Sequence, residues 1–137
     1  MSDEKRISWE EYALLLAKTA SLRSEDIYKK VGSCALRFDK SVAGVGYNGA
    51  PKGINIDWSN RDERRKRVIH SEINCLSYCC PNEIWLLACT LLPCHNCMQS
   101  IAAYNIKKVI FEEVYQRDDF SLTLAKEYGI ELVQIKL

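Results

Sequence analysis

Two short motifs fix where two helices of this chain must begin. They are His70-Ser71-Glu72 and, 24 residues after His70, Cys94-His95-Asn96-Cys97 preceded by Pro93. Residues two apart in mid-helix point roughly 200° apart, so His70 and Glu72 face one site only from a first helical turn. Cys94 and Cys97 fit the same position, because proline favours helix starts. The fold must therefore bring two helix N-termini together.

The residue types at these positions predict a catalytic zinc centre. One imidazole and two thiolates are three protein ligands, which leaves a fourth tetrahedral position for water. Zinc lowers the pKa of that water from about 15.7 toward 7. Glu72 is not needed as a ligand and can carry protons between water and a leaving amine. A lone Cys-x-x-Cys also occurs in redox pairs and structural zinc sites. The upstream His-x-Glu and the preceding proline favour the catalytic interpretation.

Composition indicates a globular chain of 137 residues that we expect to form a single domain, 1–137. No apolar run approaches the ~20 residues needed to span a bilayer. Met1 to Arg6 is charged and precedes no apolar signal core, so we expect no export. Seven cysteines then indicate reduced thiols in the cytoplasm. Two are predicted zinc ligands, and we expect the others to be small core residues: Cys34, Cys75, Cys79, Cys80 and Cys89.

The charge pattern leaves two interpretations open. The net charge of +1 argues against a dedicated nucleic-acid binder. One basic cluster, from Arg61 to Arg67, has five basic and two acidic residues. It is either a solvated helix or loop face or a docking site for nucleotide phosphates, at the substrate, an effector or a neighbouring subunit. An RNA-contacting strip is the weakest alternative.

Periodicity predicts the order αββαβαβαβ. A helix over 9–23 precedes a hairpin of strands 31–38 and 42–47, and a turn-rich loop then runs to about Arg67. Zinc-binding helices are expected over 70–80 and 94–104, with an almost wholly apolar buried strand over 84–92 between them. A strand over 108–112, a helix over 118–128 and a strand over 130–136 complete the chain. This order predicts a three-layer α/β/α fold with a central five-stranded mixed sheet, its last strands parallel.

Several segments together resemble the cytidine-deaminase-like superfamily, and most closely its deoxycytidylate (dCMP) deaminases. His-x-Glu with Pro-Cys-x-x-Cys is the signature of zinc nucleobase deaminases. Four further segments of this chain resemble the narrower family: Arg23-Ser24-Glu25-Asp26 with Val31-Gly32, Gly46-Tyr47-Asn48-Gly49-Ala50-Pro51-Lys52-Gly53, Val68 to Asn74, and Ile106 to Phe111 with Tyr115. The resemblance runs in order from about Trp9 to the C-terminus.

The resemblance implies a role for each matched residue. Zinc ligands would be His70, Cys94 and Cys97, and Glu72 would be the proton shuttle. The Asn48 amide would bind the sugar, and the Ser71 backbone N–H would bind the pyrimidine carbonyl, although Ser71 stands where the family usually has alanine. The candidates for the phosphate end of the substrate are Arg23, Ser24 and Tyr115. His95 and Asn96 are expected to have no catalytic role.

Regulation and assembly are also implied by the resemblance. Family members often form hexamers that dCTP activates and dTTP inhibits, with Mg²⁺ on the triphosphate. The effector candidates here are Gly46, Asn48, Gly49, Lys52 and Gly53, and Arg64 to Arg67 lie close enough in sequence to help neutralise a triphosphate. No nucleic-acid or membrane partner is expected.

Alternatives remain for both residues and function. Asn48 could be a left-handed turn residue, Arg23 and Ser24 an exposed helix end, and Tyr115 ordinary strand-edge packing. The chain could deaminate tRNA adenosine, free cytidine or guanine, since all use the same zinc centre. A non-catalytic zinc module is disfavoured by Glu72, because a structural site needs no proton shuttle.

Overall fold

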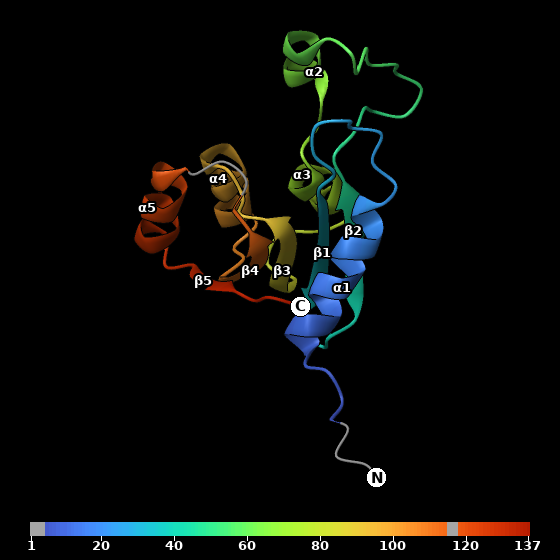
Figure 1. Ribbon diagram of the computed structural model, residues 1–137. Coiled ribbons are helices and arrows are strands. Elements are labelled where there is room, and N and C mark those ends of the chain that lie inside the picture. The colour runs from blue at the N-terminus through green and yellow to red at the C-terminus, as the bar shows by residue number, and fades with distance from the viewer. Residues whose placement is uncertain (1–4, 115–117) are drawn as a thin grey trace.

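A computed structural model describes residues 5–114 and 118–137 (Figure 1). Its strands form one sheet in the order β2-β1-β3-β4-β5. β1 (Gly32–Arg37) pairs antiparallel with both β2 (Val42–Tyr47) and β3 (Ile84–Leu91). β4 (Lys108–Glu113) and β5 (Glu131–Gln134) continue the sheet in parallel with β3. The prediction of a five-stranded mixed sheet with parallel last strands is confirmed.

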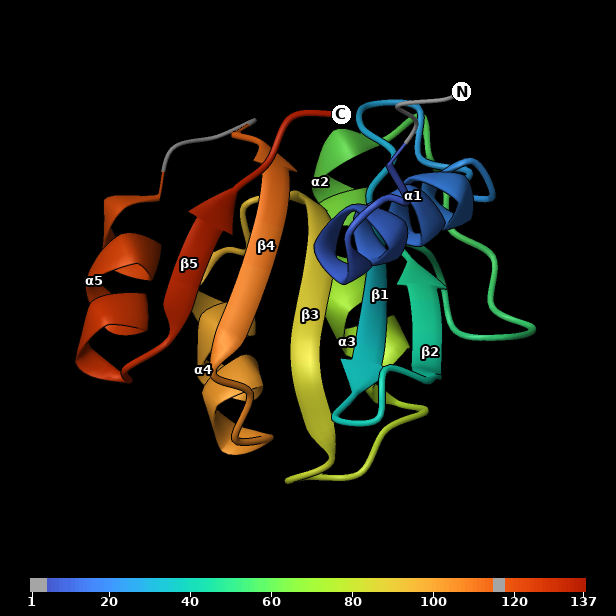
Figure 2. The ribbon, with the colours of Figure 1, turned by 90° about the horizontal axis from the view of Figure 1, so that it is seen from below.

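Helices cover both faces of the sheet, as expected (Figure 2). α1 (Trp9–Ser21) lies across one face, and α3 (Ser71–Leu76), α4 (His95–Ala103) and α5 (Asp119–Glu127) lie on the other. The strands supply alternate side chains to the two faces, as a period of two requires. Leu86 and Ala88 of β3 pack with the α1 side, whereas Leu87 and Cys89 pack with the other helices. Since β3 is buried on both faces, its continuous apolar run is explained.

Local signals account for most helix boundaries. α1 begins with a capping box in which the Ser8 side chain accepts from Glu11 N–H and the Glu11 side chain accepts from Ser8 N–H. It packs tightly on β1 because Gly32 has no side chain: a Cβ there would lie 1.8 Å from the Ala17 carbonyl oxygen. The expected turn between β1 and β2 is confirmed, with Lys40 in the left-handed region at φ 73°.

Three sequence-based expectations were wrong in detail. The segment expected to be loop as far as Arg67 contains a helix, α2 (Arg61–Arg67), capped by the Asn60 side chain. The first zinc-binding helix ends at Leu76 instead of residue 80, because the following residues form tighter turns, such as Cys79 N–H to Leu76 C=O. Cys80 is exposed and Cys79 partly so, whereas Cys34, Cys75 and Cys89 are buried as expected.

Within the described ranges, no helix combines the length and apolar character needed to cross a membrane.

Candidate active site

The three predicted metal ligands meet at the N-terminal ends of α3 and α4. His70 is the N-cap of α3 and Cys94 the N-cap of α4, with Cys97 in the first turn of α4. In the described part of the chain, neither N-cap side chain makes a capping hydrogen bond. The ligand side chains are therefore directed to one another, and the predicted convergence of two helix starts is present in the structure.

The distances among these side chains fit zinc. His70 Nδ1 lies 3.6 Å from Cys94 Sγ and 3.3 Å from Cys97 Sγ. All three ligand atoms lie within 4.8 Å of one another. Zn–N and Zn–S bonds of about 2.0 and 2.3 Å in a tetrahedron place nitrogen and sulfur about 3.5 Å apart. The residues present thus fit a tetrahedral ion with three protein ligands.

The protonation of the ligands also suits a metal cation. Hydrogen bonding from Cys97, and then from His70, lowers the pKa of the Cys94 thiol to about 4. The Cys97 pKa is raised, first by its hydrogen bond to Cys94 and then by burial. The metal-free pair therefore holds one thiolate readily and resists a second negative charge. Zinc binding has to release the remaining proton, as metal binding to thiols generally does.

Glu72 is a buried carboxyl beside the ligands. Burial raises its pKa, and the hydrogen bond from Ser71 offsets part of that effect. Ser71 Oγ donates to Glu72 Oε1 at 2.8 Å and lies 2.8 Å from Ser33 Oγ of β1. A pKa moved toward neutrality and a fixed rotamer are the properties that a group carrying protons needs.

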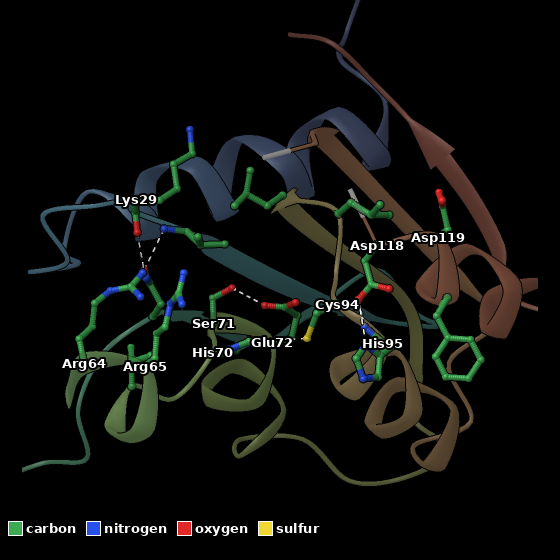
Figure 3. Close-up of a pocket in the computed structure, with 16 residues that line it drawn as sticks. Lys29, Arg64, Arg65, His70, Ser71, Glu72, Cys94, His95, Asp118 and Asp119 are labelled. Carbon is green, nitrogen blue, oxygen red and sulfur yellow. Dashed lines mark hydrogen bonds and ion pairs between the residues drawn. The ribbon is translucent and has the colours of Figure 1, made fainter. Parts of the chain in front are cut away.

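A cavity of about 580 Å³ opens above this centre (Figure 3). Its floor includes His70, Ser71, Glu72 and Cys94. One wall carries Lys29, Arg64 and Arg65, and the opposite wall carries His95, Asp118 and Asp119. Phe120 also lines the cavity, with its ring centre 5.6 Å from that of His95. This volume lies within the ~300–1,000 Å³ typical of small-molecule sites.

Asn48 lines the cavity with its amide held in place. Its Oδ1 accepts from Val31 N–H at 2.8 Å, and its Nδ2 donates to Lys29 C=O and to Asp26 Oδ2. Asn48 is absent from the described residues with positive φ, so the left-handed-turn alternative is wrong. The amide's orientation is fixed by the fold.

The other candidate residues are distributed unevenly. Ser24 is buried and donates to the Asn48 carbonyl oxygen at 2.8 Å. Arg23 is exposed and is not among the described residues lining either cavity. Tyr115 lies outside the described residues. Gly49, Lys52 and Gly53 line a second cavity of about 290 Å³, whereas Gly46 packs against α3.

Sequence reasoning did not identify several residues that lie at the site. Ser33 carried no motif, and Asp26 was noted only as part of a family segment. His95, expected to be without a role, lines the cavity with its Nδ1 2.9 Å from Asp118 Oδ2. For Arg64 and Arg65, the basic cluster was a usable signal, since docking of nucleotide phosphates was one of its two interpretations.

Comparison with known proteins places this geometry in a family. A model of the cytidine and deoxycytidylate deaminase zinc-binding region matches residues 7–113. The chain is 33% identical to a probable deoxycytidylate deaminase of Caenorhabditis elegans, covering 83% of this chain and 61% of that protein. It is 30% identical to human deoxycytidylate deaminase, covering 88% and 73% respectively. The chain thus spans less than two thirds of the nematode relative.

A solved structure supports the fold. The dCMP deaminase of cyanophage S-TIM5, in complex with dCMP and dUMP, superposes with a TM-score of 0.82 at 24% identity, covering 96% of this chain and 100% of that one. Because the family model covers most of the chain and includes Glu72 and the three candidate metal ligands, the chain belongs to the cytidine and deoxycytidylate deaminase zinc-binding family.

Proposed function

We propose that this chain hydrolyses dCMP to dUMP and ammonia, supplying the precursor of thymidylate. The observation that carries the proposal is a three-ligand metal centre with a buried carboxyl at the floor of a nucleotide-sized cavity, one wall of which is cationic. Relatives that are named deoxycytidylate deaminases support the choice of substrate.

His70, Cys94 and Cys97 would hold the zinc, which when bound would lower the pKa of a water toward 7. The chain's own residues perform the proton transfers. Glu72 takes one proton from water and delivers it to the ring nitrogen of cytosine as the water oxygen bonds to C4. It then takes the second proton of that oxygen and delivers it to the amine, whose bond to C4 breaks as the carbonyl forms and ammonia leaves. The hydroxyl of Ser71 donates to the Glu72 carboxyl and orients it. The backbone N–H of Ser71 is our proposed contact to the pyrimidine carbonyl.

Asn48 is the proposed sugar contact. Both of its amide hydrogens are already donated, to Asp26 and to Lys29, while its oxygen accepts one hydrogen bond from Val31. An amide oxygen has two lone pairs, so it can still accept one more bond. Asn48 therefore binds a sugar hydroxyl as an acceptor. For the phosphate end, the family resemblance points to Arg23, Ser24 and Tyr115, with Ser24 acting through its hydrogen bond to the Asn48 backbone.

The test is a comparison of substrates on the zinc-loaded chain. Ammonia release is measured with dCMP, deoxycytidine, cytidine, guanine and a tRNA anticodon stem. We expect dCMP to exceed deoxycytidine by at least ~10-fold in kcat/KM, because charge-assisted contacts to a phosphate are worth about 1.5–3 kcal/mol. Equal rates on nucleoside and nucleotide would favour a free-nucleoside enzyme, and turnover of the tRNA alone would favour tRNA editing.

We also propose regulation by dCTP and dTTP with Mg²⁺ at the loop of Gly46, Asn48, Gly49, Lys52 and Gly53, within a homohexamer. The second cavity supports this, because three of these residues, Gly49, Lys52 and Gly53, line it. In initial-rate curves, dCTP should shift dCMP saturation to lower concentrations and dTTP to higher ones, by roughly 5- to 150-fold at most. Light scattering gives the mass. Curves unmoved by either triphosphate would argue against the switch.

We further propose that residues 1–137 act as one deaminase domain and that the reaction takes place in the cytoplasm. All seven cysteines are free thiols in the structure, which suits a reducing compartment.

A further inference from the structure

The cationic wall of the active-site cavity comes from a helix that the sequence pattern did not predict. α2 directs Arg64 and Arg65 to the same cavity that holds Glu72, and Lys29 lies beside them (Figure 3). The carboxylates Asp118 and Asp119 line the opposite wall. One side of the cavity is therefore cationic and the other carries carboxylates, so an anionic group of a ligand is favoured on the α2 side.

Arg64 is fixed before any ligand binds. Its Nε donates to Asp26 Oδ2 at 2.8 Å, and its guanidinium carbon lies 4.9 Å from the centre of the Tyr28 ring. The Arg64 side chain is only 15% exposed. Across residues 5–114 and 118–137, its terminal Nη groups have no hydrogen-bond partner. A guanidinium held by Nε and by stacking can present both Nη groups to an oxyanion at little entropic cost.

The same buried carboxylate also holds the proposed sugar contact. Asp26 Oδ2 accepts from Asn48 Nδ2 at 3.1 Å as well as from Arg64, and its side chain is 0% exposed. Backbone N–H groups of Tyr28 and Lys29 donate to the other oxygen. One oxygen thus sets the relative placement of the sugar acceptor and the arginine, which suits a ligand in which sugar and anion are covalently linked.

Arg65 provides the unbalanced charge on this wall. The positive charge of Arg64 is matched by Asp26, and that of Lys29 by Glu113 at 3.0 Å. Arg65 makes no ion pair with any residue that the structure describes. The other cations of α2 differ from it, since Lys66 and Arg67 both pair with Glu63.

We propose that Arg64 and Arg65, in place of the exposed Arg23, hold the 5′ phosphate of the substrate and make the enzyme selective for a mononucleotide over a nucleoside. The proposal rests on the proposed function, since it names the specificity residues of that reaction. Arg64 gives directed hydrogen bonds, and Arg65 gives net charge. Asp26 is a positioning residue that ties the phosphate contact to Asn48.

The experiment measures kcat/KM for dCMP and for deoxycytidine in zinc-loaded variants. Arg65→Gln should lose about 10- to 150-fold on dCMP and change by no more than about twofold on deoxycytidine, because only the charged contact to phosphate is removed. Arg64→Gln should lose activity on both substrates, and more on dCMP, since it also leaves Asp26 unpaired beside Asn48. Lys66→Gln, which removes one charge from the same helix outside the cavity, should keep the wild-type preference.

The outcomes separate this inference from the proposed function. Wild-type chain without turnover of dCMP would refute the proposed function itself. If Arg65→Gln keeps the wild-type preference for dCMP, the assignment of the phosphate to α2 is refuted while the proposed function stands. Loss of that preference in Arg23→Gln, with no loss in Arg65→Gln, would refute the same assignment. An equal loss in Lys66→Gln and Arg65→Gln would show a long-range charge effect and no contact. Arg65 is exposed, so its variant keeps the test decisive even if Arg64→Gln fails to fold.

Discussion

Burial and a hydroxyl hydrogen bond act in opposite directions on the pKa of Glu72, and burial has the larger effect. Ser33 of β1 contacts Ser71, and Ser71 donates to the Glu72 carboxylate. Burial disfavours the charged carboxylate, whereas the hydroxyl favours it. The hydrogen bond from Ser71 therefore limits how far burial raises the pKa of Glu72.

Replacement of Glu72 by glutamine tests that role. Glu72→Gln keeps the shape of the side chain and leaves all three metal ligands in place, but the amide cannot carry a proton. We expect zinc content to stay at one ion per chain and kcat to fall at least ~10²-fold. Elemental analysis and initial rates on dCMP measure the two quantities. Loss of zinc, or full turnover, would show that Glu72 does something else.

At the scale of single residues, the sequence predicted those site residues whose spacing is fixed by the start of a helix. His70, Glu72, Cys94 and Cys97 were predicted because two helix starts impose their own separations on the ligands. The Asp26 junction was not predictable in the same way. Its partners Asn48 and Arg64 lie 22 and 38 residues away, and nothing local in the sequence marks such pairing.

Among the elements, α3 is the one whose position the chemistry depends on most. It packs against β2 at Gly46, where a Cβ would lie 2.4 Å from Cys75 N and 2.8 Å from the Ser71 carbonyl oxygen. These are backbone atoms and cannot swing away. Gly46 therefore sets how closely the helix bearing His70 and Glu72 approaches the sheet.

Gly46→Ala should accordingly displace α3. We expect the free energy of unfolding to fall by about 1–3 kcal/mol, as for overpacked cores, with weaker zinc binding. Gly49→Ala is the matched control from the same loop, because a Cβ there meets only the Tyr47 ring at 3.7 Å or more. It should change stability by no more than about 0.5 kcal/mol. Denaturant unfolding and a zinc titration compare them; equal effects would contradict this account of Gly46.

Elements with apolar periodicity were predictable, and α2 was not. Its sequence, RDERRKR, contains no apolar residue, and none of its residues is buried. Hydrophobic periodicity cannot detect such a helix. It forms through the Asn60 cap and the pairing of Glu63 with Arg67. The C-terminal end of α3 was predicted too late in the sequence. After Leu76 the backbone continues in turns whose hydrogen bonds span three residues instead of four.

The molecule as a whole is a sheet with unequal helical layers. Among the elements of residues 5–114 and 118–137, α1 packs on one face, whereas α3, α4 and α5 pack on the other. The three candidate metal ligands lie at the starts of α3 and α4. The layer order was predictable because the alternation of helices and strands restricts how a chain of this length can pack. The cavity was not predictable, since its walls come from segments distant in sequence.

Removal of zinc should therefore affect stability as well as activity. A ligand present at 100 times its Kd stabilises the folded state by about 2.7 kcal/mol. For a chain of this size that corresponds to roughly 9 °C in Tm. We expect a chelator to abolish turnover and lower Tm by at least about that amount, with both restored by added zinc. A Tm unchanged by chelation, at full loss of activity, would show that the sheet alone fixes the two helix starts.

The exposure of α2 has an evolutionary consequence. Apart from Arg64, which pairs with the buried Asp26, this helix lines the cavity with the exposed Arg65, which can change at small cost to folding. The ligands and the carboxyl belong to helices seated on the sheet, where most changes are costly. Selection can thus alter substrate preference through α2 while the metal ligands and Glu72 stay unchanged. Proteins with this fold can then evolve new substrates without changing the reaction.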